Sequence, residues 1–185
     1  DAVLQRTIIE DNIIRTIAQG SIYPSQEDDL AFIQFSSGST NLPKGVCLTD
    51  RNLLTNIRAI LNNINSPATG DLFFSWMPLT HDMGLIGYHL APSLAGWDHA
   101  IMPTELFIRK PSLWLQKINE YRVTFTASPN FGYNYVLNYL DKDKLRDLDL
   151  SCIRIITNGA EPINASLCET FVREMHPYRL KPNVI

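Results

Sequence analysis

A chain of 185 residues has the size of one domain or of a large piece of one. Hydrophobic residues make up 45% of it and charged residues 19%, which describes a globular protein that buries a core and excludes a disordered chain. The formal net charge of −3 offers no electrostatic basis for binding nucleic acid or an anionic membrane. No apolar run reaches the roughly 18 residues that a membrane span requires.

Cysteine and histidine usage excludes two further classes. The three cysteines, Cys47, Cys152 and Cys168, are widely spaced, which argues against a disulfide framework and fits a reducing, cytoplasmic compartment. With the four histidines they form no zinc pattern, because His81 and His89 have no third ligand at a suitable spacing. The first residues carry mixed charge and lack the layout of a signal peptide.

Helical and strand-like patterns alternate along the chain. Asp50 and Asn164 can each cap the helix that follows them. In chain order we expect a helix over 3–18, a polar loop over 21–29, strands over 31–36 and 45–48, a helix over 50–62, a strand over 72–76, a helix over 83–94, a strand over 99–102, a helix over 111–121, a strand over 123–127, a helix over 130–140, a strand over 152–157 and a helix over 164–176. This alternation predicts an α/β fold with a mainly parallel sheet and helices on both faces.

Ligands of such sheets bind beyond the carboxyl ends of the strands. Three polar segments begin at such ends, at Ser36, Pro78 and Asn158, each shortly after a predicted strand. We therefore expect the three segments to face one cleft.

The first of these segments, Ser36–Gly45, reads SSGSTNLPKG. Its small residues let backbone N–H groups approach a ligand, its hydroxyls add donors, and Lys44 adds a positive charge, a combination that suits a polyphosphate. It differs from the P-loop, in which the lysine follows the last glycine and a helix begins at once. The alternative is a Ser/Gly-rich surface hairpin that binds nothing.

The three segments, in this order, resemble motifs of one enzyme superfamily. SSGSTNLPKG resembles the phosphate-binding loop of the adenylate-forming enzymes, which include acyl-CoA synthetases, peptide-synthetase adenylation domains and luciferases. WMPLTHDMGLIG (76–87) is similar to the acyl-side motif of the fatty-acyl-AMP ligase branch, and NGAEP (158–162) resembles the adenine-contacting loop. FIRKP (107–111), with Trp114 and Leu115, and SPNFGY (128–133) are also similar to that branch. The resemblance runs from about Asp29 to the last residue.

The resemblance implies the activation of a fatty acid with ATP to an acyl adenylate, with release of pyrophosphate. The acyl group would then pass to the phosphopantetheine thiol of an acyl carrier protein or of a downstream synthetase module. Residues 1–185 would be the central part of the AMP-binding domain, without its N-terminal front part and without the mobile C-terminal domain. The glutamate that holds Mg²⁺, the aspartate that binds ribose and the adenylation lysine would lie outside this chain, so we expect the chain alone to be inactive.

The same resemblance implies roles for individual residues. The cofactor-binding residues would be Ser36, Ser37, Gly38, Ser39, Thr40, Lys44 and Gly45 at the phosphates, and Asn158, Gly159, Ala160, Glu161 and Pro162 at the adenine. The substrate-binding residues would be His81, Asp82, Met83, Gly84, Ile86, Gly87 and Asn130, with His81 and Lys44 also catalytic. Asn41 stands where the family usually has glycine, and Asp50 where it often has histidine.

Several residues keep a second interpretation. His81 would orient the substrate carboxylate and screen charge at the α-phosphate, or it merely hydrogen-bonds a loop carbonyl. Met83, Gly84, Ile86 and Gly87 could line a tunnel for a straight acyl chain or belong to an ordinary helix core. We expect Glu161 to be a local structural carboxylate rather than a metal ligand.

Two other functions stay open. The first is an acyl-CoA ligase, although the sequences around His81 and Asn130 favour the fatty-acyl-AMP ligase branch. The second is a non-enzymatic, degenerate domain that only binds nucleotide or packs against a partner.

Overall fold

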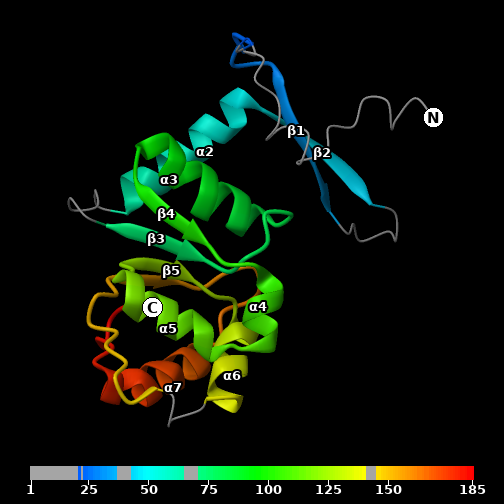
Figure 1. Cartoon of the computed structure of the whole chain (residues 1–185). Helices are drawn as coiled ribbons and strands as arrows, with labels where there is room; N and C mark the ends of the chain where they lie inside the picture. Colours follow the sequence, from blue (N-terminus) through cyan, green and yellow to red (C-terminus); the bar gives the residue numbers. More distant parts are fainter. Residues whose placement is uncertain (1–20, 22, 37–42, 65–70, 141–144) are drawn as a thin grey trace, which may run out of the picture. The chain divides into compact units, whose positions relative to one another are not determined.

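The computed structural model describes residue 21 and residues 23–36, 43–64, 71–140 and 145–185 (Figure 1). The chain divides into two compact units, Asp1–Asp50 and Arg51–Ile185. The helix predicted over 3–18 lies outside the described residues.

The first unit contains a β-hairpin. Strand β1 (Leu30–Ser36) pairs antiparallel with β2 (Lys44–Thr49), and Ser36 lies opposite Lys44. The prediction of two strands here is confirmed, but the expectation that the first of them belongs to the parallel sheet is wrong. The connection over 37–43 is shorter than the dozen or so residues that a parallel crossover needs, so these neighbouring strands can pair only as a hairpin.

The second unit is built on a four-stranded sheet. Strands β3 (Leu72–Ser75), β4 (Asp98–Ile101), β5 (Phe125–Ala127) and β6 (Ile155–Thr157) lie in the order β4-β3-β5-β6. Every pair of neighbours is parallel. The predicted parallel α/β sheet is therefore confirmed for this unit.

Helices connect these strands (Figure 1). They are α2 (Asp50–Asn63), the π-helix η2 (Met83–Leu90), α3 (Ala91–Ala95), α4 (Thr104–Arg109), α5 (Ser112–Tyr121), α6 (Asn130–Asn138), α7 (Ala165–Met175) and the 3-10 helix η4 (His176–Tyr178). Most begin within two residues of the predicted helices. Helix α4 was not predicted, because six residues are too few to show a helical period.

The predicted helix over 83–94 is present, but its first part, η2, is a π-helix and not an α-helix. In η2 the N–H of Ala91 bonds the carbonyl of Ile86, five residues back, which is the π pattern. Pro92 has no N–H with which to continue an α-helical bond to Tyr88. The segment then continues as α3 and ends at Gly96, whose φ of 69° is the left-handed conformation that favours glycine.

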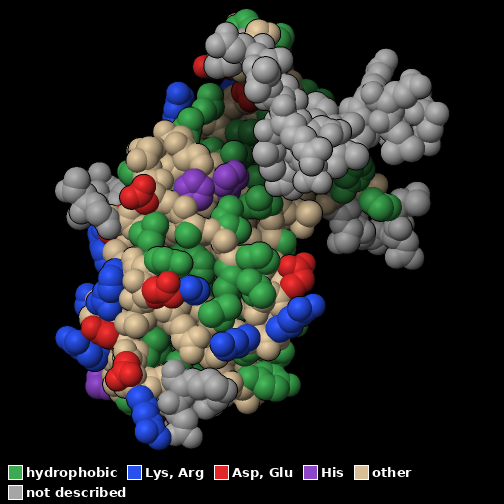
Figure 2. Space-filling model, viewed as in Figure 1, with side chains coloured by type: hydrophobic (Ala, Val, Ile, Leu, Met, Phe, Trp, Pro, Cys, Tyr) green, Lys and Arg blue, Asp and Glu red, His purple; other side chains and the backbone are tan. Residues whose placement is uncertain are grey.

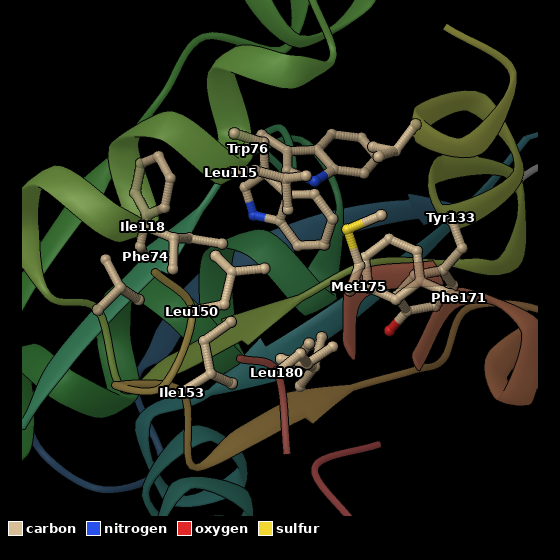
Figure 3. Close-up of a cluster of buried hydrophobic side chains, with 14 of the residues drawn as sticks. Phe74, Trp76, Leu115, Ile118, Tyr133, Leu150, Ile153, Phe171, Met175 and Leu180 are labelled. Atoms are coloured by element: carbon tan, nitrogen blue, oxygen red, sulfur yellow. The ribbon is translucent and has the colours of Figure 1, made fainter. Parts of the chain in front are cut away.

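The first face of the sheet packs on the larger hydrophobic core. Phe74 and Ile156 point to this face, where they meet side chains of α5, α6 and α7. Figure 3 shows Phe74, Phe171 and Leu180 among the side chains that converge there. Trp114 of α5 is fully buried, and its Nε1 donates to Oγ1 of Thr126 at 3.0 Å.

The second face packs on a smaller core. Because side chains alternate along a strand, Phe73 and Phe125 point away from the first core, and their rings stack at 4.6 Å between centroids. Tyr88 of η2 belongs to the same cluster, and Ile64 packs against it. Helices therefore cover both faces, as predicted.

An ion pair crosses the amino-terminal edge of the sheet. Asp71 precedes β3 and pairs with Arg154, which precedes β6, so the pair passes over β5. The Arg154 guanidinium lies over the Phe125 ring, 5.2 Å from its centroid. The side chain of Asp71 is 5% exposed and that of Arg154 is 36% exposed. The carboxylate is thus desolvated, whereas the guanidinium keeps part of its water.

We expect Asp71→Asn to lower the free energy of unfolding by about 1–3 kcal/mol. This is less than the cost of breaking a fully buried pair, because Arg154 stays partly hydrated. Urea denaturation of the chain measures the change, with exposed Asp98→Asn as a matched control that removes a charge at the start of β4. Equal effects in the two variants would show that the ion pair does not stabilise the sheet.

Candidate functional site

Tyr88 attaches η2 to the sheet. Its buried hydroxyl donates to the backbone oxygen of Thr126 at 2.5 Å and lies 2.8 Å from Oγ1 of Thr157. Because the single phenolic proton goes to Thr126, the Thr157 hydroxyl donates to Tyr88. Burial raises the pKa of Tyr88 above its usual value, so the group stays neutral and acts as a donor. These bonds fix η2 over β5 and β6.

A cavity of about 400 Å³ is lined by residues of η2, α2, the second face of the sheet and the loops at its carboxyl edge; we call it the η2 cavity. Its lining residues are Asn56, Ile60, Ile64, Phe73, His81, Asp82, Met83, Ile86, Gly87, Tyr88, Phe125, Ile155, Thr157, Gly159 and Ala160. The register places Phe73, Phe125 and Ile155 in one row across three strands, which makes an apolar floor. Thr157 and the loop residues follow towards the carboxyl edge, where the polar groups lie.

Two of the three predicted segments meet in this cavity. His81, Asp82, Met83, Ile86 and Gly87 come from the second segment, and Gly159 and Ala160 from the third. For these two segments the expectation of a shared cleft is confirmed. The cause is the parallel sheet, which brings the carboxyl ends of β3 and β6 to the same edge.

His81 and Asp82 form the start of η2. Oδ1 of Asp82 accepts from the Met83 N–H at 2.8 Å and so caps the helix. Nδ1 of His81 lies 2.8 Å from the same oxygen and 3.2 Å from the Met83 nitrogen. These contacts belong to different tautomers, because Nδ1 donates to Asp82 only when it carries a proton and accepts from Met83 only when it does not. Among the described contacts both engage Nδ1, which leaves Nε2 to meet a ligand.

Gly84 serves packing rather than the cavity. A Cβ atom at this position would lie 2.4 Å from the backbone oxygen of Pro78 and 2.8 Å from that of Met77. Gly84 is buried and is not among the described residues that line the cavity. Of the two interpretations of this residue, the structure favours helix packing. Met83, Ile86 and Gly87 do line the cavity.

The loop after β6 is held by its neighbours. Glu161 Oε1 accepts from the Phe131 N–H at 3.2 Å, in the first turn of α6. Asn130 Nδ2 donates to the Pro162 oxygen at 2.8 Å, and Asn158 Nδ2 donates to Asn130 Oδ1 at 3.0 Å. The expectation of a structural role for Glu161 agrees with this geometry. The side chains of Asn130 and Asn158 bond each other and neither residue is among the described lining of the η2 cavity.

Ala160 carries an unusual backbone within this loop. Its φ of 71° lies in the left-handed region, where an alanine side chain is strained. Residues held in such conformations cluster at ligand sites. Ala160 lines the η2 cavity, so the strained turn presents backbone groups at the polar end of that cavity.

Part of the first segment is described. Ser36 ends β1, while Lys44 and Gly45 begin β2 and are exposed. Ser37, Gly38, Ser39 and Thr40 lie outside the described residues. The phosphate-binding role of this segment stays a prediction.

The sequence did not single out eight of the lining residues. They are Asn56, Ile60, Ile64, Phe73, Tyr88, Phe125, Ile155 and Thr157. Asn56 and Ile60 of α2 and Ile64, just after its end, are four residues apart, which marks one helix face and could have been found from the sequence. The strand residues look like ordinary core residues, because apolar runs do not show which face of a sheet leaves a space.

A second hollow, of about 910 Å³, lies beside the edge strand β6. Residues of β6, α7 and the last part of the chain line it, among them Asn158, Cys168 and Val184. It includes no residue of the His81 segment. Hydrophobic side chains also reach the surface elsewhere (Figure 2). Leu106 and Phe131 are two of the exposed hydrophobic residues. In the described ranges no helix is long and apolar enough to span a membrane.

The profile of the AMP-binding enzyme family matches residues 5–181. The long-chain-fatty-acid–AMP ligase FadD32 of Mycobacterium marinum is 36% identical over 160 residues, which is 84% of this chain and 25% of the relative. The medium-chain-fatty-acid–acyl-carrier-protein ligase JamA of Moorena producens is 32% identical over 179 residues, or 96% of this chain and 30% of the relative.

A solved structure agrees with these relatives. The fatty acyl-adenylate ligase of Legionella pneumophila, in complex with acyl adenylate and pyrophosphate, superposes with a TM-score of 0.81 at 36% identity. The superposition covers 86% of this chain and 28% of the Legionella protein. The chain thus spans between a quarter and a third of the length of these proteins. It belongs to the AMP-binding enzyme family, and the relatives that it resembles include fatty-acid–AMP ligases.

Proposed function

We propose that the protein to which this chain belongs activates a fatty acid with ATP. The carboxylate oxygen attacks the α-phosphorus, a C–O–P bond forms, and the bond to the β-phosphate oxygen breaks, which releases pyrophosphate. The acyl group then passes to a phosphopantetheine thiol of a carrier protein, and AMP leaves. The relatives named as fatty-acid–AMP and acyl-carrier-protein ligases support this proposal, as does the matching acyl-adenylate complex.

The observation that carries the proposal is the two-part lining of the η2 cavity. One part is apolar, with Ile60, Phe73 and Phe125, and the other carries His81 and Thr157 near the loop of Ala160. A ligand that fits both parts has a long apolar portion and one polar end. A fatty acid has this form, and each buried methylene contributes about 0.8 kcal/mol to its binding.

His81 lines the same cavity as Gly159 and Ala160, which belong to the proposed adenine loop. In this proposal Nε2 binds the substrate carboxylate or an α-phosphate oxygen and offsets the repulsion between these two anions. To bind an anionic oxygen, Nε2 must carry a proton, and in the neutral ring Nδ1 then accepts from the Met83 amide, so the imidazole reaches the reactants already oriented. Bringing two anions together makes positioning and electrostatics the main part of catalysis.

ATP would be held by two segments. The loop 158–162 would contact the adenine, and the segment Ser36–Gly45 the β- and γ-phosphates, with Lys44 supplying charge. The described residues contain no group of three His, Cys, Asp or Glu that could hold a metal ion, and Glu161 already bonds the Phe131 amide. By the resemblance to the family, Mg²⁺ would enter with ATP, bound by its phosphates and by a carboxylate outside this chain. From the family match and the share of the relatives that this chain spans, we infer that residues 1–185 form the central part of the AMP-binding domain. We also propose that the protein works in the cytoplasm.

The full-length protein should exchange pyrophosphate into ATP only with a medium- or long-chain fatty acid. Exchange is measured with fatty acids of graded length, with amino acids and with aryl acids as the comparison classes. The 185-residue chain alone should give no exchange. An amino-acid preference would contradict the proposed substrate class, and CoA thioester formation without a carrier protein would favour an acyl-CoA ligase.

Lys44→Ala in the full-length protein should slow exchange by about 5- to 100-fold, the cost of one charged phosphate contact. Lys44 is exposed at the start of β2, so the melting temperature should stay within about 2 °C of the wild type. Lys117→Ala is the matched control, because Lys117 of α5 forms its ion pair with the exposed Glu120. This variant should leave exchange unchanged. Unchanged exchange in Lys44→Ala would remove this lysine from the site.

A further inference from the structure

Gly87 lies inside η2 and lines the η2 cavity. Glycine weakens a helix interior relative to alanine, because it has more backbone freedom to lose on folding. A glycine at such a position therefore calls for a local reason, either in the backbone conformation, in the packing, or in the space that it leaves open.

The backbone conformation gives no reason. Among the described glycines a positive φ occurs only at Gly96, after α3. Gly87 therefore has backbone angles that any L-residue can adopt.

Packing gives no reason either. A Cβ atom at Gly87 would meet no atom of the described residues within 4 Å, whereas one at Gly84 would clash with the Pro78 oxygen and one at Gly132 with Oγ of Ser128 at 2.2 Å. Gly84 and Gly132 are glycines because a neighbour occupies the space. Gly87 instead faces space that the described residues do not fill.

The position of that space points to the tail of the substrate. Tyr88, the next residue, packs its ring on Phe73 at 5.9 Å between centroids, so this part of η2 lies over the apolar floor. His81 and Asp82 lie at the other end of the segment, before Met83. A side chain added at position 87 would thus extend into the apolar part of the cavity and leave the polar end untouched.

We infer that Gly87 determines the acyl-chain length that the η2 cavity accepts. The missing side chain leaves room for methylene groups between η2 and the row of Phe73 and Phe125. A larger residue here would exclude those groups and shift selectivity to shorter acids, while the chemistry at the carboxylate stays the same. This inference rests on the proposed function, because it assigns a substrate property within the same cavity.

The test compares kcat/KM for hexadecanoic and octanoic acid in the pyrophosphate exchange of the full-length protein. Each methylene that leaves an apolar site costs about fourfold in affinity. In Gly87→Leu the ratio of hexadecanoic to octanoic acid should therefore fall at least about tenfold, mainly through a higher KM for the longer acid. In Gly87→Ala the same ratio should fall only about threefold, because one methyl group fills less of the space than a leucine side chain does.

Two variants serve as controls. Ser93→Leu adds the same side chain at an exposed position of α3 and should leave the ratio within about twofold of the wild type. Gly84→Ala should lower the melting temperature because its Cβ atom would clash with the Pro78 oxygen. The melting temperature of Gly87→Ala should equal or exceed that of the wild type, since alanine adds helix propensity here without a clash. This makes Gly87→Ala decisive even where Gly87→Leu does not fold.

The possible failures are distinct. The inference would be overturned if the ratio of hexadecanoic to octanoic acid stayed within about twofold of the wild type in folded Gly87→Ala and Gly87→Leu. The proposed function would still hold in that case, provided that the wild type shows exchange with fatty acids. Absence of fatty-acid-dependent exchange in the wild type would overturn the proposed function, and the inference with it. A lower melting temperature for Gly87→Ala would show that this glycine is needed for packing.

Discussion

The buried hydroxyl of Tyr88 is the contact on which the site depends. It donates to the Thr126 backbone and receives a hydrogen bond from Thr157, so it joins η2 to two neighbouring strands. A buried phenol without these partners would destabilise the fold by the cost of an unsatisfied polar group. The bonds therefore set the position of η2 over the sheet, and with it the width of the cavity between the helix and the row of Phe73, Phe125 and Ile155.

Two faces of one sheet serve two purposes. On the first face, Phe74 and Ile156 meet three helices and are fully packed. On the second face, η2 and α2 leave a cavity whose polar end lies at the carboxyl edge of the strands. Parallel strands bring their loops to that edge, so His81 and Ala160, distant in the chain, line the same cavity. The proposed chemistry needs this arrangement, because a long apolar tail and a reacting carboxylate must be held at once.

Much of this organisation could be predicted, for identifiable reasons. The apolar spacing of α2, the β-branched residues at 123–126 and the caps at Asp50 and Asn164 are local signals. Helices α2 and α7 begin where they were expected, and β5 begins two residues after the predicted start. Strand pairing is not local, so the sequence left open whether the strands β1 and β2 form a hairpin or the first of them joins the parallel sheet. The role of Gly84 could not be told from that of Gly87, because the atoms that would meet a Cβ come from the Pro78 backbone in one case and are missing in the other.

Methyl NMR of the chain with labelled isoleucine, titrated with decanoic acid, tests the central claim most directly. If the η2 cavity binds the acyl chain, the methyl signals of Ile60, Ile64 and Ile86 shift with one saturating affinity. Ile118 and Ile153, in the core on the other face, stay unchanged and serve as internal controls. Shifts confined to Ile163 and Ile185, beside the edge strand β6, would place the ligand in the second hollow and contradict the account.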